Sequence, residues 1–149
     1  MATNLKTIKF GENGETYAVN DYPVKVSGEL TEEATTLDFG SFADGLTELR
    51  LLVYGVAANT GNYVIPVING VAGKFVTAPG FYAYVGCLYY KKIGDIWLVE
   101  YWSSGQSAHA AQGQAMTELT SVDKITSFKL NAYPGTPFPV GTKYALEGR

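Results

Sequence analysis

His109 and Cys87 are the only histidine and the only cysteine in this chain of 149 residues. Nucleophilic catalysis and metal binding need several such side chains at defined spacings, and the motifs His-x-x-x-His and Gly-x-Ser-x-Gly do not occur. His109 lies in a stretch of Ser, Gln and Ala, which is typical of an exposed loop imidazole rather than a general base. Cys87 has apolar neighbours, which favours a buried thiol without redox chemistry.

Pairs of carboxylates are the remaining enzymatic option, because a glycosidase needs only two Asp or Glu side chains at a fixed separation. Glu32 and Glu33 are adjacent, so on a strand they would point to opposite faces. Four further carboxylates have no spacing that predicts a meeting in space: Asp38, Asp44, Glu48 and Glu100. We therefore predict that the chain is not an enzyme and has no catalytic residues, no cofactor and no metal site.

The composition indicates a single folded domain over residues 1–149. Hydrophobic residues make up 46% and aromatic residues 13% of the chain, which is ample for a core. The 17 Gly and 6 Pro residues are spread along the chain, as expected when many short strands each end in a turn. The net charge is −3 and the basic residues form no stripe, so we do not expect a nucleic-acid partner.

The N-terminal sequence has no apolar run of the kind that signal peptides carry. No stretch approaches the run of about 18 apolar residues that a membrane-spanning helix needs. We expect synthesis in a cytoplasm without insertion into a membrane.

Asn13-Gly14 predicts a β-hairpin at the start of the chain, from Leu5–Glu12 to Glu15–Asn20. Asn-Gly favours a two-residue type I′ turn, in which both central residues have positive φ. Residues 1–28 could then form an N-terminal attachment hairpin. A two-residue turn would place the large apolar side chains on one face, with these pairs: Glu12 with Glu15, Phe10 with Tyr17, and Ile8 with Val19.

Gly94-Asp95 predicts the longest hairpin, between Tyr82–Ile93 and Ile96–Trp102, with a type II′ turn. The expected pairs on the face that we assign to the core are Tyr90 with Val99, Leu88 with Tyr101, and Lys92 with Trp97. On the opposite face the expected pairs are Lys91 with Leu98 and Tyr89 with Glu100.

Further alternating runs predict additional strands. Asn69-Gly70 is a second turn signal of the Asn-Gly type, and Pro66 just before it indicates an edge or a bulge. The other runs with strand character are 24–26, 36–39, 48–58, 62–68, 71–76, 122–130 and 142–147. This number and spacing of strands predicts an all-β fold, an antiparallel β-sandwich that is jelly-roll-like.

Tyr89, Leu98 and Trp102 are the candidate subunit interface. They lie on the second face of the long hairpin, and a single sandwich has only one interior. We expect this face to be covered by the second sheet or by a neighbouring chain.

Residues 103–117 lose the alternation of a strand and contain mainly small and polar residues. We interpret this segment as a long exposed loop. Its residues Gln106, His109 and Gln112 are the candidates for contact with a host surface, because exposed loops frequently carry binding functions.

Both ends of the chain carry recognisable patterns. KTIKFG at 6–11 and GETYAVND at 14–21 combine a basic-apolar strand, a Gly turn, Thr-Tyr and Asp. Near the other end, ITSFKL at 125–130 is followed by VGTKYALEG at 140–148. The second of these segments ends in a Leu-x-Gly sequence. These segments resemble the fibre and other virion proteins of tailed phages that infect gut bacteria. At Tyr22-Pro23 the chain departs from that family, whose hairpin usually continues with Ala and Arg.

The resemblance implies a homotrimeric component of the phage virion, such as a head fibre, a tail fibre or a capsid decoration subunit. The implied partners are further copies of the chain, other virion proteins, and a glycan or protein of the host surface. A carbohydrate-binding β-sandwich module is the alternative, which the many aromatic residues favour. A glycan-cleaving enzyme ranks third.

Overall fold

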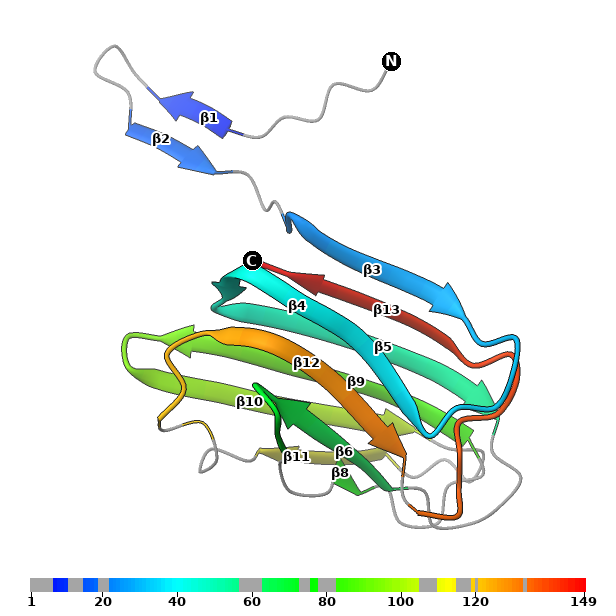
Figure 1. The fold of residues 1–149 in the computed structure, drawn as a ribbon. Helices are drawn as coiled ribbons and strands as arrows, with labels where there is room; N and C mark the ends of the chain where they lie inside the picture. The colour runs from blue at the N-terminus through cyan, green and yellow to red at the C-terminus, as the bar shows by residue number, and fades with distance from the viewer. Residues whose placement is uncertain are drawn as a thin grey trace, which may run out of the picture.

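The computed structural model describes residues 7–10, 15–18, 22–56, 63–72, 76–77, 83–104, 110–114, 119, 121–132 and 134–149. Thirteen strands lie in these ranges (Figure 1). They form two antiparallel sheets that pack face to face, and a separate two-stranded hairpin. The predicted all-β fold with an antiparallel β-sandwich is confirmed.

Sheet I is the larger sheet. Its six strands in spatial order are β11 (Ala110–Gln114), β10 (Ile96–Ser104), β9 (Ala83–Ile93), β5 (Glu48–Val56), β13 (Lys143–Gly148) and β3 (Val24–Glu29). Sheet II consists of β4 (Thr36–Leu46), β12 (Ile125–Ala132), β6 (Tyr63–Ile68) and β7 (Val71–Ala72), with β8 (Val76–Thr77) also paired to β6. The hairpin consists of β1 (Thr7–Phe10) and β2 (Glu15–Ala18).

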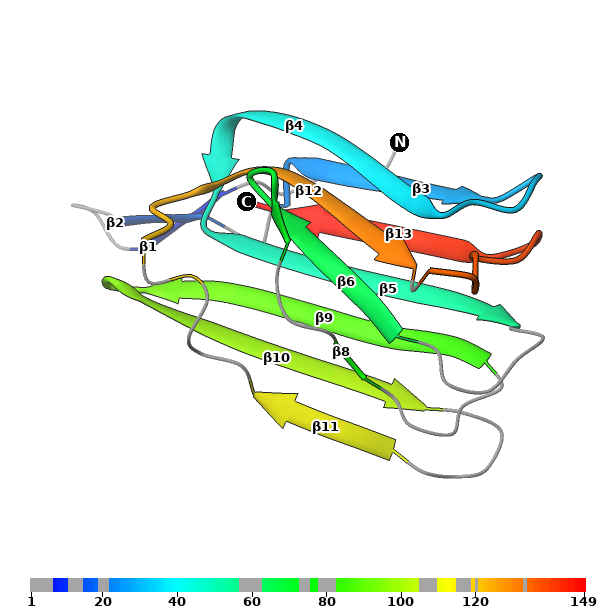
Figure 2. The same cartoon turned by 60° about the horizontal axis from the view of Figure 1, so that its bottom comes forward.

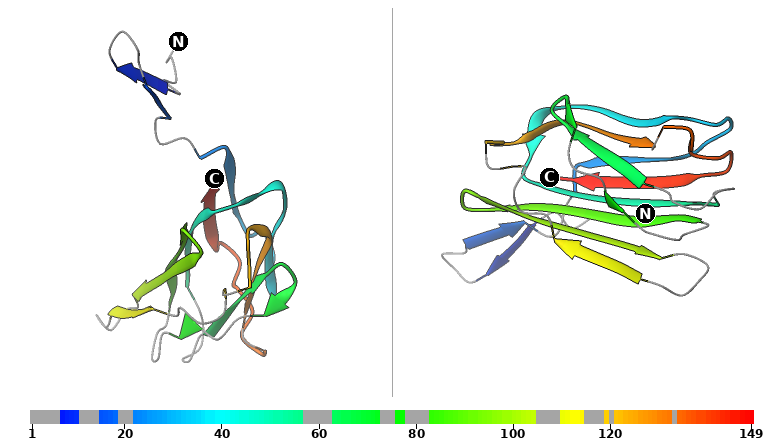
Figure 3. Two further views of the ribbon diagram at one scale, coloured as in Figure 1. Left: turned by 90° about the vertical axis from the view of Figure 1, so that its left-hand side faces the viewer. Right: turned by 90° about the horizontal axis from the view of Figure 1, so that it is seen from below.

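The chain crosses repeatedly from one sheet to the other. Strands β3, β5 and β9 belong to sheet I, whereas β4, β6 and β12 belong to sheet II (Figure 2). This winding brings β3 and β13, which are far apart in the sequence, side by side at one edge of sheet I. Figure 3 shows the two sheets facing each other, with the hairpin away from both.

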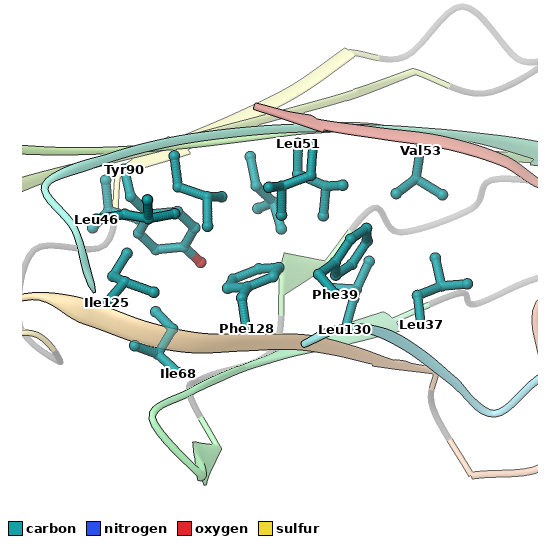
Figure 4. Close-up of a cluster of buried hydrophobic side chains, with 14 of the residues drawn as sticks. Leu37, Phe39, Leu46, Leu51, Val53, Ile68, Tyr90, Ile125, Phe128 and Leu130 are labelled. Atoms are coloured by element: carbon teal, nitrogen blue, oxygen red, sulfur yellow. The ribbon is translucent and has the colours of Figure 1, made fainter. Parts of the chain in front are cut away.

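The core fills the space between the inner faces of the two sheets (Figure 4). Because side chains alternate along a strand, every second residue of β5 from Leu49 to Val53 points inward and is buried. Phe128 of β12 is fully buried at the centre. Its ring centroid lies 5.7 Å from that of Phe39 and 5.9 Å from that of Tyr90, so aromatic contacts join the two sheets.

Two turns formed as their residues predict. Gly94 has φ 61° whereas Asp95 does not have a positive φ, which fits a type II′ turn. All five pairs expected for the β9–β10 hairpin are present, so that register is confirmed. Asn69 and Gly70 have φ 52° and 79°, as a type I′ turn requires.

Pro66 lies inside β6 rather than at the edge of the sheet, where it pairs with Leu130 of β12. On the other side of β6, β8 pairs with residues 63–64 and β7 with residues 67–68. Neither β7 nor β8 pairs with Pro66, which lies between their two stretches of pairing. Pro66 has no backbone N–H to donate to a neighbouring strand.

The register predicted for the first hairpin is wrong by two residues. Ile8 pairs with Tyr17, and Phe10 pairs with Glu15. Residues 11–14 therefore connect the strands, instead of Asn13-Gly14 alone. A shift of two residues keeps Phe10 and Tyr17 at positions of the same face, because faces alternate with a period of two.

Two further expectations for the strands also need correction. The loop predicted for residues 103–117 contains strand β11, which pairs with β10. The strand expected at 36–39 continues to Leu46. Glycines at positions 40 and 45, with φ 81° and 65°, and two register shifts along β12 accommodate this long bent strand.

Candidate functional site

The outer face of sheet I is the side turned away from sheet II. It carries the residues that alternate with the core residues of the same strands. Its described members include Lys25, Ser27, Glu29, Glu48, Arg50, Leu52, Tyr54, Cys87, Tyr89, Lys91, Leu98, Glu100, Lys143, Ala145 and Glu147.

Leu52 and Tyr54 of β5 belong to the outer face and are open to solvent, and Tyr54 pairs with Lys143 of β13. Their exposed fractions are 51% and 56%, although β5 is an inner strand of the six-stranded sheet. In the cross-strand register, Leu52 lies between Ala145 of β13 and Cys87 of β9. An apolar row therefore runs across three strands on the face that sheet II does not cover.

Charged residues flank this apolar row on both sides. Arg50 and Glu147 form an ion pair of 2.7 Å in the adjacent cross-strand row. Lys143 forms an ion pair of 3.7 Å with Glu29 in the row on the other side. These pairs are largely exposed, so each contributes at most about 1 kcal/mol to stability. The outer face thus has an apolar centre and a charged rim.

The structure places the predicted interface residues Tyr89 and Leu98 on this outer face, where both are half-buried. The side chain of Trp102 lies outside the described residues, and its backbone pairs with Cys87. We expected the second sheet or a neighbouring chain to cover this face. The second sheet does not cover Tyr89 and Leu98, because sheet II packs against the opposite side of β9 and β10.

The candidate host-contact residues fall in or beside undescribed segments. Gln106 and His109 lie outside the described residues. Gln112 belongs to β11, where it pairs with Trp102, and its side chain also lies outside the described part.

A buried carboxylate at one end of the outer face organises a group of side chains that the sequence did not predict. We call Tyr22, Glu48, Tyr89 and Arg149 the Glu48 cluster. Glu48 is only 5% exposed and accepts three hydrogen bonds. The hydroxyl of Tyr22 donates to Oε1 over 2.7 Å and that of Tyr89 over 3.0 Å, while Nε of Arg149 donates to Oε2 over 2.7 Å.

Cationic groups cover the ring of Tyr22 in this cluster. The guanidinium carbon of Arg50 lies 4.0 Å from the ring centroid, and that of Arg149 lies 4.9 Å from it. The backbone of Arg149 also pairs with that of Glu48 in both directions, at 2.9 and 3.0 Å. The cluster thereby joins the segment before β3, the start of β5 and the residue after β13.

The electrostatics of the cluster keep Glu48 ionised. Burial raises the pKa of its carboxyl group, but the hydrogen bonds from Tyr22, Arg149 and Tyr89 outweigh burial, and the pKa is lowered overall. Burial and the neighbouring Glu48 charge raise the pKa of Tyr89 to about 12 and also raise the pKa of Tyr22. The hydroxyl groups of Tyr22 and Tyr89 therefore stay protonated, and the carboxylate of Glu48 stays charged.

The carboxylates considered for catalysis lie on different sheets. Asp38 belongs to β4 of sheet II, where it forms an ion pair of 2.7 Å with Lys129. The hydrogen bond from Lys129 lowers the pKa of Asp38. Glu48 belongs to sheet I and its oxygens are taken up by the cluster. Within the described ranges, no group of three or more His, Cys, Asp or Glu side chains is placed to hold a metal ion.

Comparison of the chain with protein-family models, curated proteins and solved structures gave no match. Among the described residues, no helix has the length and apolar character needed to cross a membrane.

Proposed function

We propose that this chain is a non-enzymatic structural subunit of a phage virion, which assembles as a homotrimer through the outer face of sheet I. The exposure of Leu52 and Tyr54 on that face carries the proposal. The virion location and the three-fold symmetry rest on the resemblance of the terminal segments to phage fibre and decoration proteins. The host surface is the proposed target of the assembled particle.

Burial of the apolar row supplies the drive to associate. Covering a Leu or an aromatic side chain contributes roughly 1.5–3 kcal/mol, and each subunit offers both Leu52 and Tyr54. The charged pairs around them resemble the polar rim of a protein interface, which surrounds an apolar centre. Cyclic symmetry uses the same residues in every subunit, so a single substitution acts on all the contacts at once.

The mass of the protein in solution tests this assembly. We expect the unmodified chain to form a trimer at micromolar concentration in sedimentation equilibrium. Leu52→Glu places a charge in the apolar row, so we expect the trimer to be lost while the circular dichroism spectrum stays unchanged. Val71→Glu is the matched control, because Val71 is 71% exposed at the β6–β7 turn of sheet II.

The control variant should remain trimeric. A monomeric unmodified chain would contradict the proposal, and so would a trimer that survives the Leu52→Glu substitution. Labelling purified phage particles with an antibody against the chain tests the virion location separately. Particles that carry no label would remove the virion assignment while leaving the oligomer intact.

A carbohydrate-binding module is the second candidate, and the exposed ring of Tyr54 favours it. Aromatic faces stack on sugar rings, and Tyr54 is 56% exposed in the middle of a broad sheet. A glycan array probed with the unmodified chain and with Tyr54→Ala distinguishes this function. Binding that depends on Tyr54 in a monomeric protein would support the module and contradict the structural subunit.

A further inference from the structure

The sandwich is open along the side where β3 and β4 lie. Within the described part of the chain, β3 is paired only with β13, and β4 only with β12. Figures 2 and 3 show both strands at the same border of the sandwich. A hollow of about 510 Å³ lies between them, which we call the β3–β4 groove; its apolar lining includes Val24, Val26, Phe39, Phe42 and Leu46.

The inward side chains of β3 are incompletely covered at this groove. Val24 and Val26 point toward sheet II but are only half-buried, whereas Leu146 on the neighbouring β13 is 1% exposed. An edge strand with unpaired backbone groups and uncovered apolar side chains is a template for the addition of another strand. The groove therefore fits an extended segment that has an apolar side.

The β1–β2 hairpin is such a segment. It forms a sheet of its own, and Figures 1 and 3 show it standing away from sheets I and II. An isolated two-stranded hairpin is at best marginally stable in water. The register puts Ile8, Phe10, Glu15 and Tyr17 at positions of one face. Three of these four residues are apolar or aromatic, and we call this face the apolar side of the hairpin.

The β1–β2 hairpin is not paired with β3 of its own chain. Tyr22 is 7% exposed and reaches past β13 to bind Glu48 on β5. Pairing of β2 with β3 in the same molecule would need a reversal within residues 19–23, which include the fixed Tyr22. Such a reversal would have to form next to Tyr22 while its hydroxyl stays bonded to Glu48.

We infer that the β1–β2 hairpin of one copy adds to the free edge of β3 in a neighbouring copy, where its apolar side covers the β3–β4 groove. The added strand extends sheet I by backbone hydrogen bonds, and exchange of identical segments between copies gives a closed assembly. Lys9 and Thr16 are paired at positions of the other face, which then corresponds to the face of Ser27 in β3. This inference rests on self-association, as the proposed function does, but uses a different surface.

Disulfide trapping between two copies tests the exchange. The full-length chain with Cys87→Ser provides a background without cysteine. Copies with Lys9→Cys or Thr16→Cys are each mixed with copies that carry Ser27→Cys under mild oxidation. Neighbouring strands bring Cβ atoms about 4.5–5.5 Å apart, close enough for a disulfide after small adjustments. Val71→Cys replaces Ser27→Cys as the control, because β7 lies across sheet II from β4.

We expect a covalent mixed dimer with Ser27→Cys from one of the two hairpin positions, since only one strand of the hairpin can border β3. The Val71→Cys mixtures should show no such dimer. If neither hairpin position crosslinks above that control, the inference is wrong. A crosslink within a single chain that carries both cysteines, in a monomeric fraction, would also overturn it by showing pairing with its own β3.

The crosslink and the Leu52→Glu experiment can fail independently. A mixed dimer that forms in Leu52→Glu copies would support the hairpin exchange, even where the outer-face trimer is lost. A trimer that depends on Leu52 but gives no mixed dimer would retain the proposed function and reject the hairpin exchange.

Discussion

Replacement of Tyr22 by Phe removes one hydroxyl from the Glu48 cluster and tests whether the cluster stabilises the fold. The hydroxyl donates over 2.7 Å to a buried, ionised carboxylate, and hydrogen bonds to charged groups contribute about 1.5–3 kcal/mol. The Phe ring keeps the contact with the guanidinium group of Arg50. We therefore expect the free energy of unfolding to fall by about 1.5–3 kcal/mol at pH 7, and Tm by about 3–12 °C for a chain of this size.

The effect should depend on pH with a defined sign. The folded pKa of Glu48 lies below its ordinary value of 4.5, so its stabilisation is present above that pH and is lost as the pH falls through the folded pKa. Once Glu48 is protonated, Tyr22 bonds to a neutral group and contributes less. The difference between Tyr22→Phe and the unmodified chain should therefore be smaller at a pH below the folded pKa of Glu48 than at pH 7.

Guanidinium chloride unfolding at the two pH values, followed by tryptophan fluorescence, measures both quantities. Ser121→Ala is the control, because Ser121 is exposed and lies outside both sheets, and its loss of a hydroxyl should change stability by less than about 0.5 kcal/mol. A Tyr22→Phe variant as stable as this control at pH 7 would refute the role of the cluster. A stability difference that stays equal when the pH is lowered until Glu48 is protonated would refute the assignment to the ionised Glu48.

Three further substitutions test the core and the turns. Phe128→Ala empties the fully buried centre of the core and should cost about 3–5 kcal/mol in denaturant unfolding. Asn69→Gly keeps the positive φ of the turn but loses the three hydrogen bonds that its Oδ1 accepts, so urea unfolding should show a loss of about 1–3 kcal/mol. Gly55→Ala would bring a Cβ within 2.5 Å of Oγ1 and 3.2 Å of the backbone Cα of Thr142, and overpacking of this kind should cost about 1–3 kcal/mol, seen as a lower Tm.

The features that the sequence predicted correctly are those set by neighbouring residues. Gly94-Asp95 defines a two-residue turn, and once the turn is known every pair of the β9–β10 hairpin follows from counting. Asn13-Gly14 carries an equally strong local signal, yet residues 11–14 connect β1 and β2. Strand β11 was missed because Ala110–Gln114 contains small and polar residues without alternation, and its pairing to β10 supplies its structure.

The Glu48 cluster could not be predicted, because its members are distant in the sequence. Tyr22 lies 26 residues from Glu48, and Arg149 lies 101 residues from it. Only the pairing of β13 with both β3 and β5 brings these side chains together. The outer face was predicted in part, since the alternation of the long hairpin marks Tyr89 and Leu98. Leu52 and Tyr54 belong to a strand with apolar residues on both of its faces. Their exposure therefore follows only from the order of the strands in the sheets.

The pairing of β3 with β13 also determines how the protein responds to mechanical load. Val24 at the start of β3 pairs with Gly148 at the end of β13, so a pulling force applied at Tyr22 and Arg149 acts on the same end of an antiparallel pair. Such a force separates the two strands one pair at a time instead of shearing all their hydrogen bonds together. The bonds of Tyr22 and Arg149 to Glu48 lie ahead of the first strand pair and carry the tension first. Stretching between these two points should therefore peel β3 from the sandwich at low force, while β5, β9 and β10 stay folded.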